Sequence, residues 1–340
     1  MMMRKIITSL IWIIISCFMI YGQESSQVGT SMANFLKIGA GARATAFGDA
    51  YVAIASDASA TYWNPGGLGF LSRIEALFQS TSWIAGTDLY FLSIGIPVGN
   101  WGIFGASVYA FTSGDIEETT LIQPEGTGRL VSASDISIGV SYARQLTDRF
   151  SAGMTIKYIT EQLSRESAST VAFDIGSIFI TNFLHEMRIG ISMSNLGGKM
   201  KLDGPDLIRS HDLAPDLPTN KYVDASLSTQ DWDIPLTFRI GVATDMFKTD
   251  KSSLTIAAAV NDSRDYELRY NYGAEYGFEV TKDQKVFARV GYKDNYDEEG
   301  LTVGGGLSIS LVGYKFRVDY AYVDTGRLGN SHRYSLGIVF

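Results

Sequence analysis

From about Arg73 onward, apolar and polar residues alternate along the chain, and this period of two constrains the fold more than any other feature. Such alternation is typical of β-strands that have one apolar and one polar face. In residues 236–243, Leu, Phe, Ile and Val hold one parity, and Thr, Arg, Gly and Ala hold the other. The polar parity is rich in Gly and Ser, which favours a crowded interior over a solvated surface.

Fourteen alternating segments follow one another, many of them about nine to eleven residues long, the length of a tilted strand that crosses a membrane. They cover residues 73–83, 89–97, 101–112, 132–146, 149–164, 169–181, 186–195, 234–246, 252–261, 267–278, 285–293, 301–311, 314–324 and 332–340. An even number of strands is the rule for bacterial membrane barrels. A soluble β-sandwich, the alternative, would also alternate.

The connections between the segments also fit a barrel. Short turns are expected on one side, near Gly99, Thr147, Asn182, Thr249, Thr281 and Gly313. The long connections, 113–131 and 196–233, fall on the other side, as the outer loops of such barrels do. Residues 73–340 therefore predict an all-β protein, a 14-stranded antiparallel transmembrane β-barrel.

The first residues predict export. Arg4 and Lys5 precede an uncharged apolar run, 6–21, and Gly22 precedes polar residues, which is the pattern of a signal peptide spanning 1–22. The one cysteine, Cys17, lies inside this segment, so neither a disulfide nor thiol chemistry is expected. Apolar residues after Cys17 argue against a lipoprotein site. No later apolar run approaches ~18 residues, so no transmembrane helix is expected.

Residues 23–72 do not alternate and are rich in small side chains. Barrels of about eight strands fill themselves with side chains, whereas sixteen or more leave a channel, so fourteen strands predict a lumen that needs a plug. We expect residues 23–72 to fold into the lumen as an N-terminal hatch. Charges in a partly dehydrated lumen need partners, so the hatch residues Arg43, Asp49 and Asp57 are expected to meet lumen charges, namely Asp174, Arg188, Arg239 and Arg317.

The last strand carries a separate signal. Residues 333–340 alternate without interruption and end on an aromatic residue in phase with the apolar parity. This pattern resembles the signal that the barrel assembly machinery reads in outer-membrane proteins. The residues expected to carry it are Tyr334, Leu336, Ile338 and Phe340.

A motif block within residues 35–70 resembles the N-terminal signature of the PorV/PorQ family, which is similar to the FadL-type outer-membrane transporters. It reads Phe35-Leu-Lys-Ile-Gly-Ala-Gly-Ala-Arg43, then Ala46-Phe-Gly-Asp-Ala50, Asp57-Ala58 and Trp63-Asn-Pro-Gly-Gly-Leu68. The hatch motif residues that it marks are Arg43, Gly48, Asp49, Asp57, Trp63, Asn64, Pro65 and Gly66. Gly66 departs from the usual Asn-Pro-Ala element.

The resemblance implies a location in the outer membrane of a Gram-negative bacterium and two functions. PorV-like members serve type IX secretion, where they bind or shuttle secreted cargo through its C-terminal domain and meet the secretion translocon. FadL-like members pass hydrophobic small molecules such as fatty acids and aromatics. The many charges of the inward parity do not suit an apolar tunnel along its whole length, so secretion is the preferred hypothesis. A structural or adhesive surface protein is a third.

The sequence predicts neither an enzyme nor a cofactor. Gly39-x-Gly41-x-x-Ala44 imitates a dinucleotide-binding fingerprint but lacks its βα setting. His185, His211 and His332 lack ligand spacing, so no metal site is expected, and Ser210-His211-Asp212 is no triad, because triads are recognised by geometry. The acidic run 294–299 could hold a divalent cation or be a solvated loop, and the latter is preferred.

Two further expectations concern partners. The net charge of −8 and a pI near 5.0 argue against nucleic acid and leave lipid and lipopolysaccharide as the expected surroundings. Loop 196–233 has its own apolar residues and could bind a protein, cap a ligand pocket or pack on the barrel rim.

Overall fold

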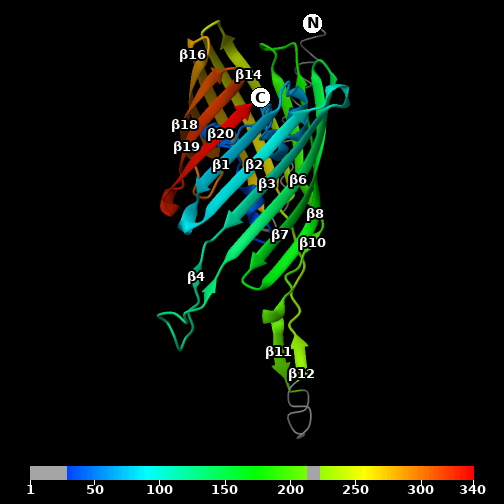
Figure 1. Cartoon of the computed structure of the whole chain (residues 1–340), viewed down its shortest axis with the longest axis vertical. Coiled ribbons are helices and arrows are strands. Elements are labelled where there is room, and N and C mark those ends of the chain that lie inside the picture. Colours follow the sequence, from blue (N-terminus) through cyan, green and yellow to red (C-terminus); the bar gives the residue numbers. More distant parts are fainter. Residues whose placement is uncertain (1–28, 213–222) are drawn as a thin grey trace, which may run out of the picture.

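The computed structural model describes residues 29–212 and 223–340, and within them fourteen strands form one closed antiparallel barrel (Figure 1). The predicted signal peptide, 1–22, lies outside the described residues. The barrel strands are β1 (Glu75–Ser82), β2 (Asp88–Pro97), β3 (Ile103–Thr112), β6 (Ala133–Thr147), β7 (Phe150–Leu163), β8 (Glu166–Ile180), β9 (Arg188–Gly197), β14 (Thr237–Lys248), β15 (Ser252–Ser263), β16 (Tyr266–Thr281), β17 (Gln284–Asp294), β18 (Leu301–Leu311), β19 (Tyr314–Asp324) and β20 (Asn330–Val339). The predicted fold class is thereby confirmed.

The barrel has apolar side chains on its outer surface and polar ones inside, as the alternation predicts. Along β14, Phe238, Ile240 and Val242 point outward and are about 40% exposed, while Thr237 and Arg239 point inward and are buried. The hydrocarbon core of a bilayer offers no partners for polar groups, so the apolar side chains of each strand face the bilayer and the polar ones face the lumen. Within the described residues, the helices are too short to cross a membrane.

The first and last strands close the barrel. β1 pairs with β20 from Glu75 opposite Val339 to Ser82 opposite His332. The backbone N–H of Phe340 donates to the carbonyl of Ile74 at 2.9 Å, and its ring lies 5.9 Å from that of Tyr314. Tyr334 and Leu336 face outward on β20.

Deleting Phe340 is expected to lower the amount of folded barrel in the membrane, because it removes the last backbone bond of the closing seam and an aromatic contact next to it. The measurement is the heat-modifiable band of the membrane fraction on a gel. The control variant is Phe183→Ala, which removes an exposed aromatic side chain from the β8–β9 turn and is expected to keep the wild-type amount. Equal membrane levels for wild type and the deletion would remove the assembly role assigned to the last residue.

The two ends of the barrel differ in their connections. One end has short turns, among them two-residue connections at 148–149, 282–283 and 312–313. The other end has the two long connections, 113–132 and 198–236, which project beyond the barrel (Figure 1). Short periplasmic turns and long outer loops are the outer-membrane pattern, so the projecting end is the outer one.

Two hairpin arms form this projecting end. The β3–β6 connection contains the hairpin β4 (Ile116–Glu117) and β5 (Leu130–Val131). The β9–β14 connection contains β10 (Lys199–Met200) paired with β13 (Trp232–Asp233), and β11 (Ile208–His211) paired with β12 (Val223–Ser226). Short 3-10 turns complete the loops: η3 (Ile84–Gly86), η4 (Gly99–Trp101), η5 (Pro205–Leu207) and η6 (Gly326–Leu328).

The second arm is shifted by two to three residues from its predicted range of 196–233. β9 continues to Gly197, because the register shifts at Asp174 and lets β8 pair with Leu196 and Gly197. β14 begins at Thr237 and not at 234, since Pro235 has no N–H for a strand ladder. The observed connection is therefore 198–236.

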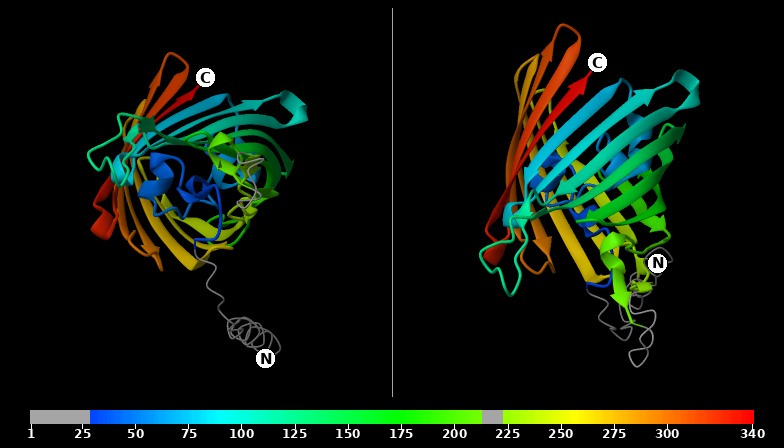
Figure 2. Two further views of the ribbon diagram at one scale, coloured as in Figure 1. Left: turned by 90° about the horizontal axis from the view of Figure 1, so that it is seen from below. Right: turned by 60° about the horizontal axis from the view of Figure 1, so that its bottom comes forward.

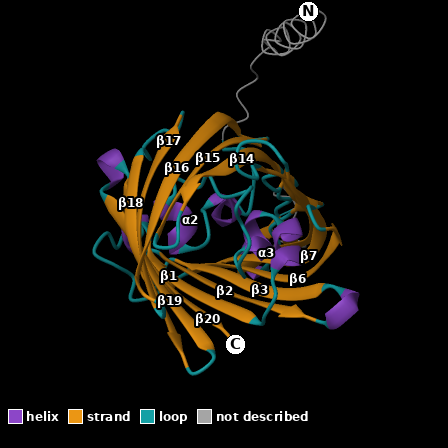
Figure 3. Ribbon diagram, turned by 90° about the horizontal axis from the view of Figure 1, so that it is seen from above, coloured by secondary structure: helices purple, strands orange, loops and turns teal. Residues whose placement is uncertain are grey.

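Residues 29–72, named here the lumen segment, lie inside the barrel (Figures 2 and 3). They form η1 (Asn34–Lys37), α2 (Ala42–Ala46), α3 (Ala60–Trp63) and η2 (Pro65–Phe70). The segment starts at the outer end, where Met32 donates to the carbonyl of Asp233. It ends near the short turns, where Ser151 donates to the carbonyl of Gly66. The lumen segment thus runs the length of the barrel interior.

Candidate functional site

Glycines of the barrel wall hold the lumen segment at van der Waals distance. A Cβ at Gly190 would collide with the backbone of Val52 and Ala53, and one at Gly291 with the backbone of Gly48. Gly153 and Gly273 do the same against the backbone of Pro65 and Phe47. At Gly176 and Gly304 a Cβ would collide with side chains of the segment, those of Asn64 and Ala46. Because only glycine lets two backbones approach so closely, the small residues of wall and segment are complementary.

The motif residue Gly48 has two reasons to be glycine. Its φ of +67° lies in the left-handed region, which other residues rarely adopt. A Cβ there would also meet the backbone of Tyr272 and Tyr292. The turn at Gly48 is therefore both conformationally and sterically fixed.

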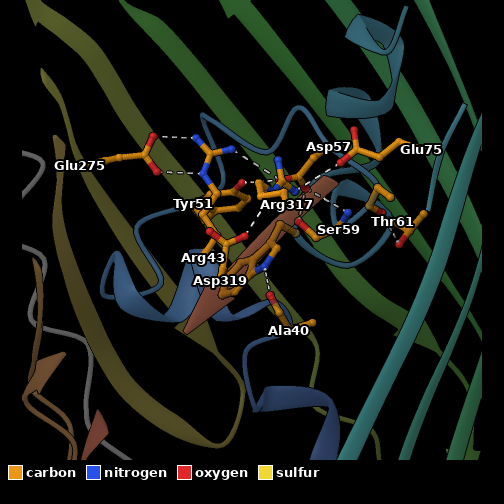
Figure 4. Close-up of polar contacts among 12 residues, drawn as sticks. Ala40, Arg43, Tyr51, Asp57, Ser59, Thr61, Glu75, Glu275, Arg317 and Asp319 are labelled. Carbon is orange, nitrogen blue, oxygen red and sulfur yellow. Dashed lines mark hydrogen bonds and ion pairs between the residues drawn. The ribbon is translucent and has the colours of Figure 1, made fainter. Parts of the chain in front are cut away.

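Asp57 is the centre of the polar contacts between the lumen segment and the wall (Figure 4). Its carboxylate lies 3.0 Å from Nη2 of Arg317 on β19 and 3.6 Å from Nη1 of Arg43. It also accepts hydrogen bonds from the Tyr51 hydroxyl at 2.8 Å and from the Ser59 backbone N–H at 3.0 Å. This buried carboxylate is thus saturated by partners from both the segment and the barrel.

The network continues from Arg43 and Arg317 to three further strands. Arg43 donates through two nitrogens to Glu275 on β16, each at 2.9 Å. Arg289 on β17 bridges Glu275 at 2.5 Å and Asp319 on β19 at 2.7 Å. Arg317 also contacts Glu75 on β1 at 3.3 Å. Three cations and four carboxylates therefore tie the segment to strands on both sides of the seam.

A second polar anchor lies nearer the outer end. Lys293 on β17 lies 2.5 Å from Asp49 of the segment and 2.7 Å from Glu299 of the β17–β18 loop. Burial tends to raise the pKa of Glu299, but Lys293 outweighs it and holds the pKa below its ordinary value. Glu299 is therefore ionised at neutral pH although it is half-buried.

The Trp-Asn-Pro-Gly element packs the base of the segment. Trp63 donates its indole N–H to the carbonyl of Ala40 at 2.6 Å. The Asn64 amide donates to the carbonyls of Val52 and Ser177, and its oxygen accepts from Gly66, so that it caps η2 with Pro65 in the first turn. A Cβ at Gly66 would collide with the backbone of Gly176, which explains glycine in place of the usual alanine.

Three of the four expected lumen partners do not meet the charges of the segment. Asp174 lies 2.9 Å from Lys157 on the adjacent β7, and Arg188 lies 2.8 Å from Asp245 on the adjacent β14. Arg239 lies over the rings of Tyr62 and Trp63, 5.5 and 5.4 Å from their centroids. Cross-strand neighbours are therefore the partners of Asp174 and Arg188, whereas Arg239 contacts aromatic rings of the segment and none of its charges. Of the expected pairs, Asp57 with Arg317 is present.

Sequence reasoning missed two wall residues that anchor the segment. Lys293 has the same inward parity as Arg289, and Glu75 has the same parity as Leu77 and Gln79. Both lie inside the predicted segments 73–83 and 285–293, so the alternation by itself would have identified them.

The acidic loop is solvated at Asp297, whose side chain is 92% exposed, while Glu298 and Glu299 are half-buried. Asp297 lies 3.5 Å from Arg269, Glu298 pairs with Arg327, and Glu299 pairs with Lys293. Cations of the chain therefore neutralise Glu298 and Glu299, while water screens the longer contact of Asp297. In the described part of the chain, His, Cys, Asp and Glu do not gather into a group that could hold a metal ion. His332 meets the Tyr320 hydroxyl through Nδ1 at 2.8 Å.

Asp57 makes the stability of the fold depend on pH. Burial tends to raise the pKa of Asp57, but Arg317 and Arg43 outweigh it and hold the pKa below its ordinary value. Its contribution is therefore fully present above the ordinary aspartate pKa of about 3.9 and is lost as pH falls through the lower, folded value.

We expect the difference in free energy of unfolding between wild type and Asp57→Asn to be constant from pH 7 to about pH 4.5 and to shrink below about pH 3.9. Denaturant unfolding in detergent across this range measures it. A difference that grew on acidification would contradict the assignment of Asp57 as an ionised partner.

The fold and the filled lumen define a class: an outer-membrane β-barrel of the FadL-like fold. Solved structures with this fold include the toluene transporter TbuX of Ralstonia pickettii (TM-score 0.56, 12% identity, 88% of this chain and 97% of that chain). A FadL homologue of Pseudomonas aeruginosa matches with a TM-score of 0.52 and 13% identity, over 86% of this chain and 96% of that chain. At these identities the likeness concerns the fold alone.

The family is defined by sequence. The family model described as "Type IX secretion system protein PorV" matches residues 21–263, and the chain belongs to this family. No curated protein matches the chain. The predicted membership, and with it a place in the outer membrane, is confirmed.

Proposed function

We propose that this protein binds exported proteins at the outer face of the membrane for type IX secretion, with the barrel as a platform and not as a conduit. The observation that carries the proposal is the filled lumen. Ion pairs tie the segment 29–72 to β16, β17 and β19. Wall glycines let it pack so closely that a Cβ at their positions would collide with it. A barrel closed in this way is suited to binding on its outside.

The hairpin arms support a role in binding. Apolar side chains on them are exposed beyond the barrel: Ile116, Leu121, Ile122, Leu130, Ile208 and Leu227. Exposed apolar side chains outside the membrane are typical of protein–protein contacts. The partners that we propose for them are the C-terminal domains of secreted proteins and the secretion translocon, in a Gram-negative outer membrane with lipopolysaccharide around the rim. The proposal assigns the protein no enzymatic role.

The test is a pull-down of isolated C-terminal domains of exported proteins by the purified barrel. Replacing residues 205–228 with a short Gly-Ser linker removes β11 and β12 but keeps the β10–β13 pair at the base. We expect capture by wild type and loss in this variant, while Asp283→Asn in a short periplasmic turn keeps capture. A wild-type barrel that captures none of the domains would refute the proposal.

Passive transport of hydrophobic small molecules is the second candidate. It is favoured by an apolar cluster in the outer half of the lumen, with Phe91 and Tyr109 5.7 Å apart and Tyr62 beside them. The fold is also that of proteins described as toluene transporters. Phe35 and Leu36 of the lumen segment fill this cluster, so transport needs the segment to move. Uptake of a labelled fatty acid or aromatic compound that depends on residues 23–72 would favour this function.

A further inference from the structure

A pocket of about 480 Å³ opens at the outer end of the barrel, apart from the polar network around Asp57. It lies between the start of the lumen segment and the β15–β16 and β17–β18 loops. Its lining includes Asn34 and Lys37 of the segment, Tyr266 and Arg269 of β16, and Tyr296 and Asp297 of the second loop.

Arg269 is the cation of this pocket that lacks a close partner. Its guanidinium lies 3.8 Å from the ring centroid of Tyr266 and 4.4 Å from that of Tyr296, which fixes its position. Its Nε is buried without a hydrogen-bond partner among residues 29–212 and 223–340. Its ion pair is with Asp297, at 3.5 Å, and the side chain of Asp297 is 92% exposed. Water therefore screens this contact.

The other cation of the pocket is fully matched. Lys37 lies 2.6 Å from Asp265, and the same carboxylate accepts hydrogen bonds from Ser31 and Ser263. The contrast identifies Arg269 as the group that a ligand would satisfy. A guanidinium that lies over two aromatic rings is already ordered for a planar oxyanion, so little entropy is lost when it binds one.

We infer that this pocket binds a carboxylate of an acidic peptide segment presented from outside. The inference rests on the proposed function and names the chemistry of one contact with the exported protein. A volume of about 480 Å³ is that of a small-ligand site and admits a short extended segment. The exposed carboxylates Glu267 and Asp297 at the pocket repel a doubly charged phosphate more than a singly charged carboxylate, so they favour a peptide over a phosphate.

The experiment compares two peptides by ligand-observed NMR on the purified full-length barrel. The probes are acetyl-Gly-Glu-Gly-amide and acetyl-Gly-Gln-Gly-amide, with inorganic phosphate as a third. We expect the glutamate peptide to bind about tenfold more tightly than the glutamine peptide, since a charge-assisted hydrogen bond is lost in the latter. Arg269→Gln is expected to abolish the difference. The control is Arg264→Gln, which is expected to keep the difference. Arg264 is an exposed arginine of the β15–β16 loop and pairs with Asp233.

A variant that binds more tightly cannot be explained by a folding defect, so a second variant is designed to gain affinity. Asp297→Asn removes the competing carboxylate of a 92% exposed side chain and is expected to tighten binding of the glutamate peptide about two- to threefold. Equal binding of the two peptides, or phosphate binding as tightly as the glutamate peptide, would overturn the inference. If exported domains are still captured in that case, the proposed function stands. If wild type captures none, the proposed function fails whatever the peptides do.

Discussion

Replacing Asp57 by alanine is expected to destabilise the protein by about 3–5 kcal/mol, the cost of removing one partner from a buried ion pair. Arg317 and Arg43 would remain in the lumen without the carboxylate that they share. Tyr51 and the backbone N–H of Ser59 would lose their acceptor as well. Denaturant unfolding in detergent, followed by the loss of the heat-modifiable form, measures the effect.

Which part of the molecule loosens in Asp57→Ala is as informative as the size of the destabilisation. If Asp57 ties the lumen segment to the wall, its removal loosens the segment before it unfolds the strands. A cysteine placed at Ser59 in a Cys17→Ser background reports this, because Cys17 is the one cysteine of the chain. We expect faster maleimide labelling at position 59 in Asp57→Ala. Asp283→Asn, an exposed side chain in a two-residue turn, is the control and should change neither stability nor labelling. Labelling as slow as in the wild type would show that Asp57 does not hold the segment.

Replacing Gly291 by alanine is expected to cost about 3 kcal/mol, at the upper end of the range for overpacking, because the added methyl group meets the backbone of the lumen segment. Its Cβ would collide with the N and Cα of Gly48, and neither backbone can turn away as a side chain would. Gly48 is itself confined to a positive φ, which leaves it little freedom to adjust.

Gly305 provides the matched control for this substitution. It lies on the neighbouring strand β18, and a Cβ there would meet its nearest atom, the carbonyl oxygen of Phe287, at 3.5 Å, an ordinary contact. We expect Gly305→Ala to be close to neutral. The two free energies of unfolding, measured side by side, test the fit between wall and segment. Equal values for the two variants would contradict a segment packed against the wall backbone.

The strands were predictable because a membrane barrel repeats one rule at each position. Every outward side chain of β14 is apolar from Phe238 to Val242, and every inward one is small or polar, so the period alone locates the strand. The end of a strand is less determined. The beginning of β14 at Thr237 depends on the missing N–H of Pro235, a local effect that the alternation does not contain.

Contacts inside the lumen were less predictable. Parity shows that Arg188 faces the lumen. It does not show whether the nearest carboxylate belongs to the lumen segment or to the next strand. The answer for Arg188 is Asp245, and it depends on the register between β9 and β14. From the sequence, the pair of Asp57 with Arg317 was one of several possible combinations. The path of the lumen segment depends on packing and not on a repeating sequence pattern, so the sequence does not select among them.

The central claim is that the lumen segment closes the barrel, so that the protein binds its partners outside and conducts nothing through its interior. Conductance of the purified wild-type protein in a planar lipid bilayer tests this most directly. The account predicts no steady ion current above that of the bare bilayer, and step-like currents once Asp57→Ala loosens the segment. A stable open channel in the wild type would contradict it.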